Sequence, residues 1–92
     1  SFGSLVYSAV FYSAIEKLLE DAPRTAKMLR FAVADRDQSH FRGFGGKNIQ
    51  AIKNLYPDAQ IVIDFTRGQH PGHISLEVEK GKPICFNIPG II

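Results

Sequence analysis

The fold prediction for this chain rests on residues 41–64, FRGFGGKNIQAIKNLYPDAQIVID. Three of the four residues at 43–46 are glycine, and a lysine follows them directly. Apolar residues then recur at helical spacing over positions 49–56, which predicts a helix that Pro57 ends. Residues 60–66 alternate between apolar and polar side chains, as in a strand with one buried face. The stretch therefore predicts a glycine loop, a helix and a strand, in that order.

The sequence on either side of this stretch adds a helix and further strands. Residues 5–20 place apolar side chains at helical spacing, and residues 35–40 are polar and predict a turn with a short helix. Residues 29–34 and 73–79 alternate as strands do, and residues 84–88 form either another strand or an extended tail. A sheet with one apolar face needs helices over that face. We therefore predict a two-layer α+β fold with a three-stranded sheet, or a four-stranded one, covered on one face by helices.

Composition limits the classes of protein to which the chain can belong. Its 92 residues suit a single domain, and an apolar content of 45% is enough for one packed core. The net charge of +2 permits an anionic partner without requiring one. We see no apolar run long enough for a bilayer and no signal peptide, so we expect no membrane partner. The lone Cys85 favours a reducing compartment, and hence an intracellular location in cytoplasm or nucleus.

The glycine loop has two interpretations. Glycine lets a ligand approach the backbone closely, and a helix N-terminus presents unpaired N–H groups with partial positive charge. Gly43 to Lys47, with Arg42 beside them, therefore suits a phosphate contact; the other interpretation is a plain turn. The spacing to the lysine is too short for a Walker-type loop, and the segment before the loop is helix-like, unlike that of a dinucleotide fingerprint.

The segment GFGGKNI at residues 43–49, followed by Ile52 and by a strand with Ile61 and Ile63, resembles the core of a KH domain. The longer stretch at residues 45–64 looks most like the KH repeats of vigilin-type proteins. The resemblance covers residues 31–78, about half of the chain. It implies a KH-like core at 29–79, preceded by a helical extension or permuted helix at 1–28 and followed by a strand or tail at 80–92.

The resemblance also implies a function. KH domains hold about four unpaired nucleotides of RNA, or of single-stranded DNA, on a GxxG loop and an adjacent groove. Such modules take part in post-transcriptional regulation, need no cofactor and are not enzymes. Carried over to this sequence, the nucleic-acid-binding residues are Arg42, Gly43, Phe44, Gly45, Gly46, Lys47, Asn48, Ile49, Ile52, Val62, Ile63 and Arg67.

Three departures from the KH pattern give a second hypothesis. Phe44 and Gly45 stand where a basic residue is usual, and Arg42 stands where an aliphatic one is usual. A standard eukaryotic KH domain ends in a helix, whereas this chain begins with one. The second hypothesis is a divergent KH-like domain that binds a protein or dimerises, through the N-terminal helix or the apolar C-terminal tail.

Other polar residues suggest ordinary structural roles. His70 and His73 with Cys85 are too few for a zinc site, which needs about four ligands. Asp35 and Asp37 resemble turn and cap residues more than a catalytic pair. We see no set of nucleophile, base and orienting group, and we therefore expect neither a metal site nor an enzyme.

Overall fold

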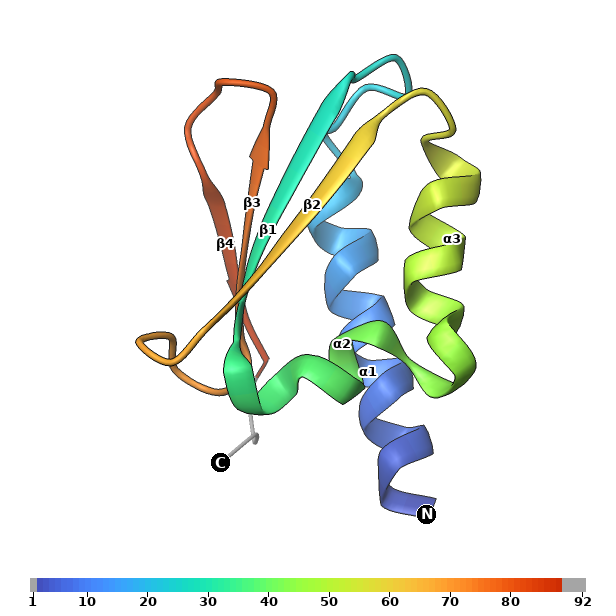
Figure 1. Cartoon of the computed structure of the whole chain (residues 1–92), viewed down its shortest axis with the longest axis vertical. Helices are drawn as coiled ribbons and strands as arrows, with labels where there is room; N and C mark the ends of the chain where they lie inside the picture. Colours follow the sequence, from blue (N-terminus) through green and yellow to red (C-terminus); the bar gives the residue numbers. More distant parts are fainter. Residues whose placement is uncertain (1, 89–92) are drawn as a thin grey trace.

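The computed structural model describes residues 2–88 and has the predicted α+β architecture (Figure 1). Its elements are α1 (Phe2–Leu19), β1 (Met28–Ala34), α2 (Gln38–Arg42), α3 (Lys47–Leu55), β2 (Gln60–Thr66), β3 (His73–Val78) and β4 (Ile84–Asn87), with short 3-10 turns η1 (Asp35–Asp37) and η2 (Phe44–Gly46). The final apolar segment is thus a fourth strand up to Asn87. The rest of the predicted interacting tail, residues 89–92, lies outside the described part of the chain.

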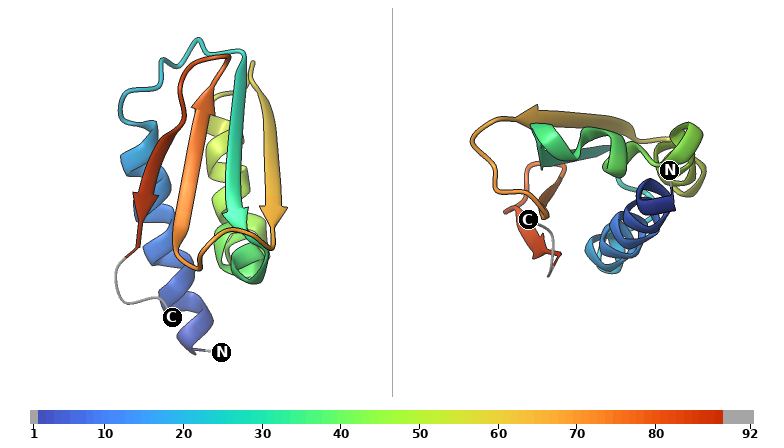
Figure 2. Two further views of the ribbon diagram at one scale, coloured as in Figure 1. Left: turned by 90° about the vertical axis from the view of Figure 1, so that its left-hand side faces the viewer. Right: turned by 90° about the horizontal axis from the view of Figure 1, so that it is seen from below.

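The four strands form one mixed sheet in the order β2-β1-β3-β4. β1 and β2 are parallel, and the chain crosses between them through α2, the glycine loop and α3. β3 runs antiparallel to both β1 and β4. Figure 2 shows the helices gathered on one face of this sheet, with the other face open. A crossover of this kind brings the carboxyl ends of β1 and β2 to the same end of the sheet.

The core lies between the sheet and the helices. The register places Phe31 of β1 between Ile63 of β2 and Leu76 of β3. Because side chains alternate along a strand, the predicted apolar faces of these strands meet in one layer. Phe41 of α2 extends this layer, with its ring centre 5.3 Å from that of Phe31 and 6.3 Å from that of Phe65.

Helix α1 covers the remaining part of the sheet and buries Phe11, Ile15 and Leu18. Its first turns project past the end of the sheet (Figure 2). None of the helices within residues 2–88 combines the length and the apolar character that a bilayer crossing requires.

Candidate nucleic-acid interface

The glycine loop lies between α2 and α3, and its conformation depends on Gly43. This residue has φ of +81° and ψ of 168°, a backbone region that is essentially open only to glycine. A Cβ atom at this position would lie 2.7 Å from Cγ of Asn48 and 3.0 Å from its backbone nitrogen. The chain therefore turns out of α2 in a way that a larger residue would not permit.

Asn48 fastens the loop to the rest of the domain. Its side-chain amide donates to the backbone oxygen of Ser8 in α1 at 3.0 Å and to that of His40 in α2 at 3.4 Å. The side chain is buried. Asn48, one of the predicted binding residues, thus has a structural position: its hydrogen bonds connect α1, α2 and the start of α3.

The first turn of α3 faces outward from this loop. Gly46 precedes the helix in a left-handed conformation, and no side chain caps the helix there. Lys47, the first helical residue, is exposed, and the first turn carries no acidic residue. The start of α3 therefore combines partial positive charge from unpaired N–H groups with the charge of Lys47.

Three exposed arginines lie at the end of the sheet where β1 and β2 finish, and we call them the basic rim: Arg36, Arg42 and Arg67. They come from three segments, since Arg36 follows β1, Arg42 ends α2 and Arg67 follows β2. The parallel pairing of β1 and β2 brings Arg36 and Arg67 to the same end of the sheet. The basic rim is thus assembled by the topology and not by neighbours in sequence.

Two adjoining hollows run along the basic rim. The first, of about 590 Å³, is lined by Asp35, Arg36, Gln38, Ser39, Arg42, Gly43 and Gly46. The second, of about 370 Å³, is lined by Ala34, Asp35, Arg36, Arg67, Gln69 and Pro71. Asp35 and Arg36 form the wall that the two hollows share. The glycine loop, the end of α2 and the loop after β2 are therefore accessible to one extended ligand.

Among residues 2–88, no carboxylate forms an ion pair with an arginine of the basic rim. The ion pair among residues 2–88 joins Lys17 to Glu20 on α1, well away in the sequence from the rim arginines. Asp37 is buried and accepts a hydrogen bond of 2.6 Å from the backbone N–H of Gly72. The guanidinium carbon of Arg42 lies 5.3 Å from the centre of the Phe65 ring, a cation–π contact that orients the guanidinium group.

The predicted groove residues do not gather at the loop. Ile52 is fully buried, while Ile49 and Ile63 are partly buried and pack against the core. Val62 lies opposite Arg30 of β1, on the open face of the sheet, because it alternates with Ile63. The structure therefore brings Gly43 and Gly46 together with Arg42 at one hollow, places Arg67 at the adjoining hollow, and places these apolar residues elsewhere.

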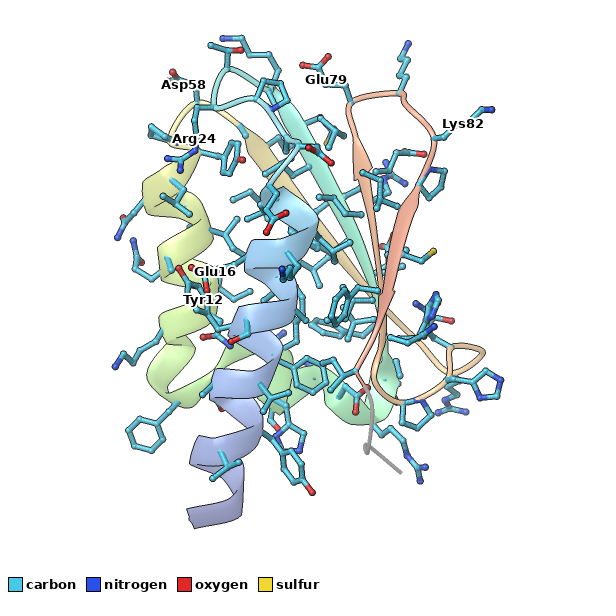
Figure 3. All side chains as sticks on the ribbon, turned by 180° about the vertical axis from the view of Figure 1, so that it is seen from behind. Tyr12, Glu16, Arg24, Asp58, Glu79 and Lys82 are labelled. Atoms are coloured by element: carbon cyan, nitrogen blue, oxygen red, sulfur yellow. The ribbon has the colours of Figure 1, made fainter. Side chains whose placement is uncertain are left out.

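Phe44 is the most exposed large apolar side chain of the loop, with 68% of its surface accessible. It lines an apolar groove of about 370 Å³ between α1 and α3, together with Ser8, Ala9, Tyr12, Lys47, Asn48 and Ala51. Figure 3 shows Tyr12 in this space between the two helices. The loop thus presents the backbone of Gly43 and Gly46 toward the basic rim, and the side chains of Phe44 and Lys47 toward the groove beside α1.

Sequence reasoning missed Arg36. It lies two residues after the end of the first of two strands that a helical crossover joins, and such strands run parallel. A basic residue within two positions of the end of each such strand, as with Arg36 and Arg67, is a signal that both lie at one end of the sheet. Among the described residues no three His, Cys, Asp or Glu side chains are placed to hold a metal ion.

Comparisons of the chain with protein-family models, with curated proteins and with solved structures found no match. The geometry of the basic rim and of the glycine loop is therefore the basis for a functional proposal.

Proposed function

We propose that this chain binds single-stranded RNA, and that the basic rim and the glycine loop hold its phosphates. The observation that carries the proposal is that three arginines from three segments line two adjoining hollows, one of them beside the loop, without an ion pair to any of them among residues 2–88. The planar guanidinium fork matches the oxygens of a phosphate and forms two charge-assisted hydrogen bonds with it. A row of such groups suits an anion with several phosphates better than a single small ligand.

The loop supplies contacts that the arginines do not. The space beside Gly45 and Gly46 is open, because a Cβ atom added to either residue would meet nothing within 4 Å, and a sugar-phosphate chain therefore has room to approach the backbone. The uncapped start of α3 offers N–H groups to a phosphate, and Lys47 adds a charge beside them. Gly46, the residue before α3, lines the same hollow as Arg42, so the start of the helix continues the basic rim, while Lys47 lines the adjacent groove beside Phe44.

The sequence resemblance supports the same proposal. In the structure the glycine loop lies between two helices and a strand follows, which is the order that a KH-like core implies. The exposed ring of Phe44 offers a face on which an unpaired base can stack, whatever its identity. Preference for a single strand follows from this ring, because bases in a duplex are already stacked.

The test is a titration of a fluorescently labelled ten-nucleotide RNA, followed by anisotropy. We expect Arg36→Ala with Arg67→Ala to weaken binding roughly tenfold or more, because two phosphate contacts are lost. The matched control is Lys80→Ala with Lys82→Ala, which removes the same charge from the turn before β4 and should change affinity less than about twofold. Raising the salt concentration should lower the wild-type affinity with a log–log slope of roughly −0.7 for each neutralised phosphate.

Equal losses in the two double variants would contradict the proposal, because only general charge would then matter. A second variant tests the loop itself. Replacing Phe44 and Gly45 by aspartate should abolish binding while the circular dichroism spectrum stays native, since Asp tolerates the left-handed conformation that Gly45 adopts. Undiminished binding by this variant would exclude the loop.

A second candidate function, protein interaction, is favoured by the outer surface of α1. Val6 and Val10 are 45% and 37% exposed, whereas the residues seven positions later on the same helix face are Ser13 and Lys17. Its test is sedimentation velocity of Val6→Ser with Val10→Lys, which gives the first half of α1 the polar surface of the second. If α1 is an interaction surface, the wild type associates and the variant does not, whereas the two bind RNA with the same affinity.

A further inference from the structure

The two edges of the sheet differ in how they are protected. Edge strands expose unpaired backbone groups, and proteins usually shield them with short length, lysine or proline. β4 has four residues and follows the segment Lys80–Pro83, which contains two lysines and a proline. β2 has seven residues, QIVIDFT, with neither lysine nor proline and with one charge, at Asp64. Within residues 2–88 no segment lies beyond β2 in the plane of the sheet (Figure 2).

The hydrogen bonds of β2 to β1 identify the backbone groups on the free edge. Gln60 donates its N–H to the carbonyl of Lys27 at 2.8 Å. In a parallel ladder, alternate residues of a strand bond to a given neighbour, so Val62, Asp64 and Thr66 direct their backbone groups toward β1 as Gln60 does. The N–H and C=O groups of the other three residues, Ile61, Ile63 and Phe65, therefore point outward from the sheet.

We propose that a second copy of this chain pairs with this edge, β2 against β2 and antiparallel, about a two-fold axis at Ile63. This register sets Ile63 opposite Ile63 of the second copy, and Ile61 opposite Phe65. Every outward N–H and C=O of these residues then meets an outward group of the other strand. The result is a closed dimer with one continuous sheet.

The side chains of β2 favour this register. An aromatic residue opposite a β-branched residue is a stabilising cross-strand pair, and the symmetry provides the Ile61–Phe65 pair twice. Asp64 lies opposite Val62 of the second copy, so no like charges face each other. An edge of seven residues buries less area than a standard interface, so we expect a dissociation constant on the order of 10–100 μM. This dimer does not depend on RNA binding.

Disulfide trapping tests both the pairing and its register. In this register Val62 of one copy and Asp64 of the other copy form a non-hydrogen-bonded pair. Their Cα atoms are about 4.5 Å apart, a distance that a disulfide spans. In a Cys85→Ser background, one preparation carries Val62→Cys and another Asp64→Cys. After mild oxidation at about 100 μM, the mixture should give severalfold more covalent dimer on a non-reducing gel than either preparation alone.

The separate preparations are the control for register. In each of them the two cysteines occupy the same position in both copies, and the symmetry places such positions diagonally across the strands, farther apart than Val62 and Asp64 of opposite copies. A mixture that gives no more dimer than its components overturns the register. A wild-type chain that sediments as a monomer up to about 1 mM overturns the dimer. Association that disappears in the Val6→Ser, Val10→Lys variant, with no trapping at β2, would assign self-association to α1 and also overturn the proposal.

Discussion

The two ends of the sheet differ in the charge of the side chains around them. At the rim end, where β1 and β2 finish, three arginines line two adjoining hollows, one of them beside the glycine loop, and Asp35 is the carboxylate that lines both hollows. At the other end, acidic and basic side chains are mixed: Figure 3 shows Arg24, Asp58, Glu79 and Lys82 near that end. One end is therefore suited to a polyanion, and the other is electrically balanced.

The two ends also differ in how the backbone is held. At the balanced end, the Tyr56 hydroxyl donates to the carbonyl of Ala22 at 2.8 Å, and Glu79 accepts the N–H of Lys27 at 3.0 Å. At the rim end, the loop holds its shape through glycine conformations and through Asn48. The comparison teaches that the balanced end is closed by conventional side-chain contacts, whereas the rim end leaves its backbone exposed. Exposed, preformed backbone is what a ligand site requires.

The largest expected effect is that of Gly43→Ala at the rim end. The added Cβ meets Asn48 at 2.7 Å, in a backbone region that only glycine adopts readily. We expect the free energy of unfolding to fall by about 3 kcal/mol, and RNA binding to weaken with the displaced loop. Urea denaturation followed by circular dichroism measures the first effect, and the anisotropy titration measures the second.

Gly46→Ala is the matched control, because this glycine also has positive φ but has open space around its Cβ position. It should lower the free energy of unfolding by about 1 kcal/mol. Equal losses for the two substitutions would mean that the contact with Asn48 does not constrain the loop.

The second effect belongs to the balanced end. Tyr56→Phe removes the donor to the buried carbonyl of Ala22 and keeps the ring in place. We expect a loss of about 1.5 kcal/mol in the free energy of unfolding, with RNA affinity unchanged. A fall in RNA affinity at a temperature where the variant is fully folded would contradict the separation of the two ends.

The fold could be predicted because periodicity reports it directly. Alternation at Leu29, Phe31 and Val33 and at Ile61, Ile63 and Phe65 identified strand faces that the structure buries or half-buries together. The predicted bounds of residues 60–66 agree with those of β2. Periodicity carries no information on strand order, so the position of β1 between β2 and β3 came from the structure alone.

The site could be predicted only in part for the same reason. The loop residues and Arg42 are neighbours in the sequence, so a local motif identified them. Arg36 and Arg67 meet through the sheet topology, and a local motif cannot pair them. Asn48 and Ile52 show the converse: both lie within the motif, and the structure buries both. A motif thus locates a segment, whereas packing decides which of its side chains a ligand can reach.

The smallest expected effect is a gain of function at Asp35. This residue is the carboxylate that lines both hollows of the basic rim, so its charge opposes an incoming phosphate. Asp35→Asn keeps the shape of the side chain and removes that charge. We expect RNA to bind about threefold more tightly, with the gain largest at low salt because the interaction is screened.

Asp58→Asn at the balanced end is the control, with the same change in net charge at a position far from the loop (Figure 3). It should leave the affinity within about 1.5-fold of the wild-type value. A similar gain from both variants would mean that RNA responds to the net charge of the domain, and the proposed difference between the two ends of the sheet would then have no part in binding. A gain at Asp35 alone locates the RNA phosphates at the rim end.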